Sequence, residues 1–266
     1  MLDATKQLAV VTGASTGIGL QLARQCAEHG FDLIIAANEP QIEKAAEELR
    51  IGGTKVEAVQ ADLATIEGNE TLYRALDGRP VTALLANAGR GLGRAFLDQD
   101  FDDIRYVIDT NITGTLYLIQ KVGRDMRARG EGKILITGSI AGFIPGSYQA
   151  VYNGTKAFLD SFSYALREEL KDSGVTVTCL MPGATETEFF RRADMLDTKV
   201  GTEEKASPLD VAKDGFAAMM AGEGAIVSGL QNKMQVAAAH VLPSEMLARQ
   251  HSHQARPGTA KTARDR

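Results

Sequence analysis

The chain has 266 residues, 44% of them apolar and 24% charged, which is typical of an ordered globular protein rather than a disordered one. Its net charge of −5 and its scattered basic residues argue against nucleic-acid binding. No apolar stretch approaches the roughly 20 residues needed to cross a bilayer, and the start of the chain lacks the basic and apolar segments of a secretory signal. We therefore expect a cytoplasmic protein with neither nucleic acid nor membrane as partner. We expect no metal site.

The two cysteines, Cys26 and Cys179, both lie among apolar or helix-forming residues. Such cysteines behave as small buried apolar side chains, and a single possible pair is not a disulfide framework. A reducing compartment fits this usage.

Short apolar runs and longer helical periods alternate along the chain. The runs are typical of buried parallel strands and cover Leu8–Thr12, Asp32–Ala36, Val56–Gln60, Ala83–Ala86, Lys133–Thr137 and Val175–Leu180, with Ile226–Ser228 as a last short strand. The apolar spacing predicts helices over Gly17–His29, Pro40–Arg50, Asp102–Arg129 and Tyr152–Asp172.

This alternation predicts an α/β fold: a Rossmann-like, doubly wound parallel sheet in three α/β/α layers. No break suggests a second domain, so we expect one Rossmann-like domain over residues 1–249. Residues 250–266 contain almost nothing apolar. We expect them to form a mobile tail, and we assign it no role.

A glycine-rich turn follows the first strand and leads directly into a helix. Glycine lets the backbone approach a pyrophosphate, and a helix N-terminus offers free N–H groups to the anion. The spacing is Gly-x-x-x-Gly-x-Gly, which differs from the dinucleotide fingerprint Gly-x-Gly-x-x-Gly, and a turn used only for tight packing is the alternative. The predicted cofactor contacts are Gly13, Ser15, Thr16, Gly17, Ile18 and Gly19.

Small polar residues also follow the third and fourth strands, where ligands bind in open α/β sheets. Asp62, next to Leu63, is placed to accept a hydrogen bond from an adenine amino group, although a loop or capping role is equally open. Asn87, Ala88 and Gly89 follow the fourth strand and are expected to line the same crevice.

The end of the second strand, Ala36-Ala37-Asn38-Glu39, bears on the choice between NAD and NADP. An acid there binds the ribose 2′-hydroxyl, whereas an arginine binds a 2′-phosphate. Here neither stands in the usual place, but Asn38 or Glu39 can reach the hydroxyl and no cation is at hand for a phosphate. The sequence thus leans to NAD, unless both residues are solvated loop residues.

Tyr152 and Lys156 are four residues apart, which on a helix places both side chains on one face. Ionising a tyrosine at neutral pH costs about 4 kcal/mol, and a cation about 4 Å away at an effective dielectric near 20 supplies a similar attraction. Tyr152 is therefore predicted to be a general acid and base, with Ser139 hydrogen-bonding the substrate oxygen. Taken singly, the pair could lie on a surface, Ser139 could cap a helix, and Asn111 could simply bend one.

Taken together, these residues resemble the short-chain dehydrogenase/reductase family, in its single-domain branch. The resemblance spans about Gln7 to Ser228 and rests on Thr12–Gly19, Asp62, Asn87–Gly89, Asn111, Ser139, Tyr152, Lys156, Pro182, Gly183 and Thr187. It implies an NAD(P)-dependent oxidoreductase that interconverts a carbonyl and an alcohol, and a homodimer or homotetramer built through the tyrosine-bearing helix.

The resemblance also implies a role for each matching residue. Ser139, Tyr152 and Lys156 look like the catalytic serine, tyrosine and lysine, and Lys156 would also bind the nicotinamide ribose. Asn111 looks like the asparagine that holds a water in the proton relay. The segment from Pro182 to Thr187 looks like the one that contacts the nicotinamide carboxamide and pyrophosphate, with contacts expected at Pro182, Gly183, Thr185 and Thr187. The departure from the family pattern at Ala36-Ala37 leaves the cofactor preference open.

Two other functions remain as alternatives: an NAD(P)-binding sensor or scaffold without catalysis, and a sugar-nucleotide epimerase or dehydratase that retains NAD. The substrate itself is almost unspecified. The pocket walls are expected from Arg90–Phe96, Ile140–Gln149 and the segment after Thr187, with Phe143, Ile144, Phe189 and Phe190 as apolar candidates. Their mixture suggests a medium-sized, partly apolar carbonyl compound or secondary alcohol.

Overall fold

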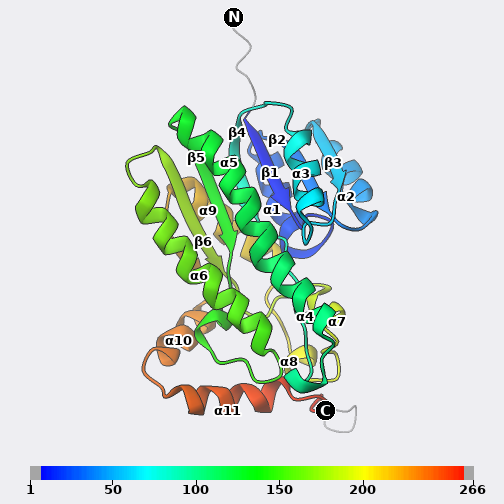
Figure 1. Cartoon of the computed structure of the whole chain (residues 1–266), viewed down its shortest axis with the longest axis vertical. Coiled ribbons are helices and arrows are strands. Elements are labelled where there is room, and N and C mark those ends of the chain that lie inside the picture. The colour runs from blue at the N-terminus through cyan, green and yellow to red at the C-terminus, as the bar shows by residue number, and fades with distance from the viewer. Residues whose placement is uncertain (1–6, 261–266) are drawn as a thin grey trace, which may run out of the picture.

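A computed structural model describes residues 7–260 of the chain. Its centre is a seven-stranded parallel sheet in the order β3-β2-β1-β4-β5-β6-β7, which is visible in Figure 1. The strands are β1 Leu8–Thr12, β2 Asp32–Ala37, β3 Val56–Gln60, β4 Val81–Ala86, β5 Gly132–Thr137, β6 Val175–Met181 and β7 Ala225–Val227. The predicted doubly wound α/β fold is therefore confirmed.

The central strands are buried on both faces, which explains their unbroken runs of valine, isoleucine, leucine and alanine. In β1, Val11 is paired with Ile35 of β2 on one side and with Leu85 of β4 on the other. The strand order reverses between β1 and β4, and this reversal creates the crevice in which such sheets bind ligands.

Helices cover both faces of the sheet. One face is packed by α1 Gly17–Glu28, α2 Gln41–Arg50 and α9 Pro208–Ala221, whose buried side chains share one apolar core with the strands. The other face is packed by α3 Ile66–Ala75, α5 Thr115–Arg129 and α6 Ala150–Leu170. Of these, α3 and α9 were not predicted, although Thr65 and Ser207 each cap the start of one of them with a side-chain oxygen.

The single helix predicted over Asp102–Arg129 has an irregular middle. It consists of α4 Phe101–Ile108, a π-helical segment η2 Asp109–Gly114, and then α5. Such wide turns occur frequently at functional sites, and this one contains Asn111. Two short 3₁₀ helices, η1 Phe96–Asp98 and η3 Ile140–Phe143, complete the loops at this end of the sheet.

Four helices from the last third of the chain cover the carboxyl end of the sheet, at the bottom of Figure 1. It contains α7 Phe189–Arg192, α8 Lys199–Thr202, α10 Leu230–Ala239 and α11 Ser244–Ala255. Within residues 7–260, no helix is long and apolar enough to span a membrane.

The predicted boundary of the tail at Gln250 is wrong. Helix α11 continues to Ala255, which is 1% exposed and packs with Phe190 and Met195. Beyond the helix, the backbone N–H groups of Gly258 and Ala260 donate to Asp197. Hydrogen bonds to distant residues also hold this segment, including those of His251 with Ser147 and of Thr259 with Lys199, and an apolar pattern does not reveal such contacts. Residues 261–266 lie outside the described residues.

Candidate active site

A cavity of about 940 Å³ opens at the carboxyl edge of the sheet, over the reversal point between β1 and β4. The structure gathers on its wall Ser139 and every residue predicted to contact the cofactor: Gly13, Ser15, Thr16, Gly17, Ile18, Gly19, Asn38, Asp62, Leu63, Asn87, Ala88, Gly89, Tyr152, Lys156, Pro182, Gly183, Thr185 and Thr187. Asn111, which is 0% exposed, lies behind this wall and not on it.

The glycine turn has a geometry that residues with a side chain adopt only under strain. Gly13 and Gly17 have φ angles of 65° and 59°, in the left-handed region that favours glycine. A Cβ on Gly19 would lie 2.1 Å from the carbonyl oxygen of Gly13, so the first turn of α1 packs directly on the loop. The Asn87 side chain donates to the carbonyl oxygens of Thr12 at 3.1 Å and Gly13 at 3.4 Å, which ties the end of β4 to the same turn.

The first turn of α1 fits a dinucleotide pyrophosphate. Thr16 occupies the N-cap without a side-chain hydrogen bond to the helix, and the first turn contains no acidic residue. The N–H groups at this end are therefore available to an anion, and the positive end of the helix dipole is not neutralised.

The two polar residues predicted to contact the adenosine are joined by a third. The Tyr106 hydroxyl accepts from Asn38 Nδ2 at 3.0 Å and donates to Asp62 Oδ1 at 3.1 Å. Asp62 also accepts from the backbone N–H of Ala64 at 3.1 Å, so it shapes its own loop as well as lining the cavity. Tyr106 was not predicted, because it comes from the middle of α4, far away in the sequence.

Glu39 is the acidic residue of this end, and the structure corrects the statement that no cation is at hand. Arg192 of α7 donates to both carboxylate oxygens of Glu39, at 2.7 and 2.9 Å, across 153 positions of sequence. Ser15 of the glycine turn donates to the same carboxylate at 2.5 Å. Burial acts to raise the pKa of Glu39, but the hydrogen bonds from Ser15 and Arg192 outweigh it and hold the pKa below its usual value.

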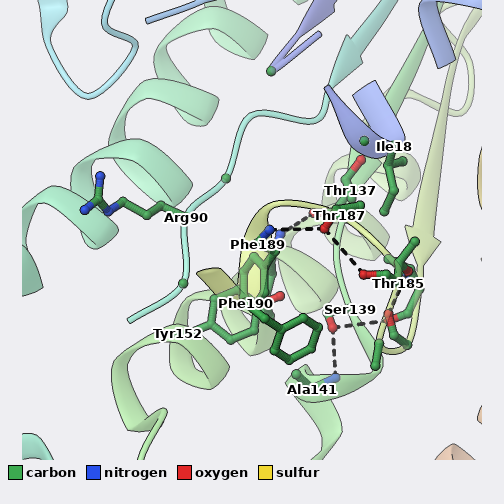
Figure 2. A pocket seen from close by; sticks show the side chains of 18 of the residues that line it. Ile18, Arg90, Thr137, Ser139, Ala141, Tyr152, Thr185, Thr187, Phe189 and Phe190 are labelled. Carbon is green, nitrogen blue, oxygen red and sulfur yellow. Dashed lines mark hydrogen bonds between the residues drawn. The ribbon is translucent and has the colours of Figure 1, made fainter. Parts of the chain in front are cut away.

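Ser139, Tyr152 and Lys156 meet at the other end of the cavity. Ser139 follows β5, and its hydroxyl accepts from the N–H of Ala141 at 3.1 Å and donates to the carbonyl of Pro182 at 3.3 Å. It therefore caps the short helix η3, as one alternative held, while still lining the cavity. In Figure 2, the ring of Tyr152 lies beside Ser139 and the two phenylalanines of α7, whereas Arg90 points away.

Lys156 is 4% exposed, and its ammonium donates to the carbonyl oxygen of Thr137 at 2.7 Å. The ammonium lies 5.8 Å from the centre of the Tyr152 ring. Burial lowers the pKa of Lys156 to about 8, against the opposing effect of the Asp160 carboxylate.

The predicted acidification of Tyr152 does not appear in this cavity. Burial raises the pKa of Tyr152 to about 12, and a hydrogen bond with Ser139 opposes that rise only in part. Desolvation of the phenolate is thus the larger effect. Tyr152 is a neutral phenol here, which is the state that donates a proton.

Asn111 braces the site from behind. Its side-chain oxygen accepts from the N–H of Arg90 at 2.7 Å, and its Nδ2 donates to the carbonyl of Arg90 and to Thr155 Oγ1, both at 2.9 Å. The π-helical turn thus joins the loop after β4 to helix α6, three residues after Tyr152.

Some of the residues that line the substrate side of the cavity were predicted from the sequence, and others were not. Arg90, Ile144, Phe189 and Phe190 line the cavity as expected, and the ring of Phe189 lies 5.0 Å from that of Tyr152. Phe143 does not, because it packs against His240 with ring centres 5.3 Å apart. The unpredicted wall comes from the end of the chain, through Leu230, Gln231, Asn232 and Gln235 of α10 and His251 and Gln254 of α11.

His251 has a defined tautomer. Its Nδ1 lies 2.9 Å from the carbonyl oxygen of Ser147, which can only accept, so Nδ1 carries the proton and Nε2 is an acceptor. Burial lowers the pKa of His251, which favours this neutral form.

Comparison with known proteins agrees with this geometry. The family model described as short chain dehydrogenase matches residues 7–195. An uncharacterized oxidoreductase of Myxococcus xanthus is 34% identical over 71% of this chain and 76% of its own length. The very-long-chain 3-oxoacyl-CoA reductase of Pyricularia oryzae is 36% identical over 64% of this chain, which spans only 53% of that protein.

Among solved structures, a short-chain dehydrogenase from Sphingobium yanoikuyae in complex with NADPH superimposes with a TM-score of 0.79. It is 27% identical, and the match covers 89% of this chain and 96% of that one. Sequence family, sheet topology and cavity residues therefore converge. This chain belongs to the short-chain dehydrogenase family and is an NAD(P)-dependent oxidoreductase that interconverts a carbonyl and an alcohol.

Proposed function

We propose that Tyr152 exchanges the proton of the reaction with the substrate oxygen while Ser139 hydrogen-bonds that oxygen. The observation that carries this proposal is that Tyr152, Ser139 and Lys156, from two different elements, line one cavity with the glycine turn. NAD(P) supplies or accepts the hydride when bound. The high pKa of Tyr152 keeps its proton on the phenol until a substrate oxygen becomes basic enough to take it.

Lys156 and Asn111 act around this pair in the proposal. The Thr137 carbonyl holds the Lys156 ammonium at the cavity wall, where it is available to the nicotinamide ribose. Asn111, through its hydrogen bonds with Arg90 and Thr155, fixes the loop and helix that border the site. A water held by Asn111 remains part of the proposal by resemblance to the family.

We propose that the enzyme prefers NAD to NADP. Glu39 supports this preference, because a carboxylate with a lowered pKa at the end of β2 accepts from a ribose hydroxyl and repels a phosphate. In this arrangement the Arg192 guanidinium forms an ion pair with Glu39 and does not present its charge to a 2′-phosphate. The Sphingobium relative binds NADPH, so cofactor choice varies within this fold and has to be measured for this chain.

The proposed substrate is a partly apolar carbonyl compound or secondary alcohol with a polar group remote from the reacting carbon. Phe189 and Phe190 provide an apolar surface next to Tyr152. The wall made by α10 and α11 is rich in amides and contains the neutral His251. A substrate matching both walls has its apolar part at the phenylalanines and hydrogen-bonding groups toward the chain's end.

The decisive experiment is to titrate NAD(H) and NADP(H) into the purified enzyme while screening carbonyl and alcohol substrates. The panel includes bulky ketones, secondary alcohols, a 3-oxoacyl thioester and a sugar nucleotide. Turnover with a simple carbonyl/alcohol pair is expected, with a lower KM for NAD. Tight cofactor binding without turnover across the panel would favour the sensor, and action on the sugar nucleotide with retained NAD would favour the epimerase.

We also propose a cytoplasmic homo-oligomer. Two buried free cysteines, Cys26 and Cys179, are compatible with a reducing compartment. Apolar side chains stand exposed on the tyrosine-bearing helix α6, where Phe158 is 41% exposed, and on the neighbouring α4, where Phe101 is 68% exposed. Light scattering of the purified protein measures the oligomeric state directly.

A further inference from the structure

A buried carboxylate lies beneath the catalytic serine and has no part in the proposed chemistry. Asp160 comes one turn after Lys156 on α6, on the same helix face, and is 5% exposed. Its Oδ1 accepts from the backbone N–H of Ser139 at 3.2 Å and from the Cys179 thiol at 3.6 Å. Its Oδ2 is buried and receives no hydrogen bond from any residue in the range 7–260.

The backbone around Ser139 is shaped to admit this carboxylate. A Cβ on Gly138 would lie 1.9 Å from Asp160 Oδ1, and a Cβ on Gly142 would lie 2.1 Å from Oδ2. Glycine at both positions therefore leaves room for the carboxylate group. A buried, half-satisfied charge is expensive compared with an apolar side chain of the same size, so folding alone does not explain an aspartate here.

The charged and titratable groups around Asp160 come from three elements. Lys156, Tyr152 and Tyr164 are on its own helix, Cys179 is on β6, and the N–H of Ser139 follows β5. Burial raises the pKa of Asp160 to about 6, with the charge of Lys156 opposing the rise, so the group is ionised at neutral pH. Its charge in turn opposes the effect of burial on Lys156.

We propose that Asp160 is a positioning residue of the active site: its carboxylate fixes the backbone of Ser139, and its negative charge keeps the neighbouring Lys156 cationic. This inference rests on the proposed roles of Ser139 and Lys156. Asp160 itself does not line the cavity, so it acts through these two residues and touches neither substrate nor cofactor.

The first test needs no turnover and therefore stands apart from the proposed function. Lysine labelled with ¹³C at Cε reports the titration of Lys156 by NMR, and the signal is assigned by its loss in Lys156→Met. The midpoint, about 8 in the wild type, is expected to fall by about one unit in Asp160→Asn, because an opposing charge is removed. In Glu169→Gln, which neutralises an exposed acid on the same helix, it is expected not to move. An unchanged midpoint in Asp160→Asn would overturn the proposal.

The second test is the pH profile of kcat/KM with the substrate found by screening. At low pH the wild-type carboxyl is protonated and resembles asparagine, so the two proteins are expected to converge near pH 5. They are expected to diverge about fivefold near pH 8 and to approach about tenfold at higher pH, because a fall of one unit in the pKa of Lys156 changes its cationic fraction by at most about tenfold. A ratio that is constant across pH would mean a merely structural role and would overturn the inference.

If Asp160→Asn does not fold, Cys179→Ala decides the question. It keeps the carboxylate but removes the thiol that donates to Oδ1 and lowers the pKa of Asp160. The acid limb of the wild-type profile is then expected to move to higher pH, while an unmoved limb would contradict the proposal. If Tyr152→Phe is inactive while Asp160→Asn has the same pH profile as the wild type, the proposed function stands and only this inference is contradicted.

Discussion

The walls at the two ends of the cavity come from different parts of the sequence. At the nucleotide end, the wall includes one continuous turn, in which a Cβ on Gly13, Gly17 or Gly19 would lie within 3.0 Å of a neighbouring atom. At the substrate end, the wall combines residues of α7, α10 and α11. A wall made by one close-packed turn suits a ligand that is constant, whereas residues on separate helices can be altered without moving the strands.

The two ends are nevertheless joined by one short helix. In α7, Phe189 packs against Tyr152 at the reacting end, and Arg192 pairs with Glu39 at the nucleotide end. Substitutions that change cofactor use without changing substrate turnover, or the reverse, therefore test whether the two ends act independently.

The largest effect is expected from Tyr152→Phe, which removes the phenolic hydroxyl and with it the exchangeable proton. General acid and base catalysis contributes about 100- to 10,000-fold, so kcat is expected to fall by about 1,000-fold. The dissociation constant of the cofactor, measured by calorimetry or fluorescence, is expected to change by less than about threefold. Tyr164→Phe on the exposed side of the same helix is the control and should keep full activity.

Retention of more than about a tenth of the activity in Tyr152→Phe would remove the acid/base assignment. A large loss of cofactor binding in the same variant would instead show that the two ends are not separable at this residue.

The nucleotide end could be predicted from sequence because its constraints are local. Gly13, Gly17 and Gly19 lie next to one another in the chain, and residues at strand ends such as Asp62 and Asn87 meet at the edge of any parallel sheet. The strand bounds followed from buried apolar runs for the same reason. All predicted cofactor contacts consequently line one cavity.

Contacts between segments that lie far apart in the sequence could not be predicted in this way. Arg192 reaches Glu39 across 153 positions, and His251 reaches Ser147 across 104, so neither contact leaves a local pattern. Asp160 was missed because a lone acid on a helix gives no sign of burial. The electrostatics of Tyr152 also required coordinates, because they depend on how much water burial removes.

A smaller effect, on cofactor choice, is expected at Glu39. Glu39→Gln removes the charge that repels a 2′-phosphate and releases Arg192 to bind one. The ratio of kcat/KM for NADP to that for NAD is expected to rise about 10- to 100-fold, corresponding to about 1.4–2.8 kcal/mol. Glu188→Gln, which releases the adjacent Arg191 instead, should leave the ratio unchanged.

Adding Arg192→Ala to Glu39→Gln is expected to abolish most of the gain in NADP use. If the double variant keeps the gain, the guanidinium is not the phosphate ligand, and the nucleotide end is then independent of α7.

A still smaller effect is expected from His251→Phe on α11, which preserves bulk but removes the Nε2 acceptor. Loss of one hydrogen bond to the substrate is worth about 1 kcal/mol, so KM for the substrate is expected to rise about five- to tenfold. KM for the cofactor should not change. His253→Phe on the exposed side of the same helix is the matched control, and equal effects of the two changes would deny α11 a role in binding.

An effect on stability is expected from Asp160→Asn, between the two ends of the cavity. The pKa of Asp160 is raised from 3.8 to about 6 in the folded protein, so between these values the folded state holds a proton that the unfolded state has released. Stability is therefore lost as pH rises through this window, and the loss is complete above pH 6, with an upper limit of about 3 kcal/mol. Asparagine does not incur this loss.

We expect Tm of Asp160→Asn to exceed that of the wild type by about 3–6 °C at pH 7.5 and to match it at pH 4. A variant that is more stable yet less active at neutral pH would mark the aspartate as kept for catalysis, whereas a lower Tm at both pH values would mark it as a structural support of the Ser139 turn.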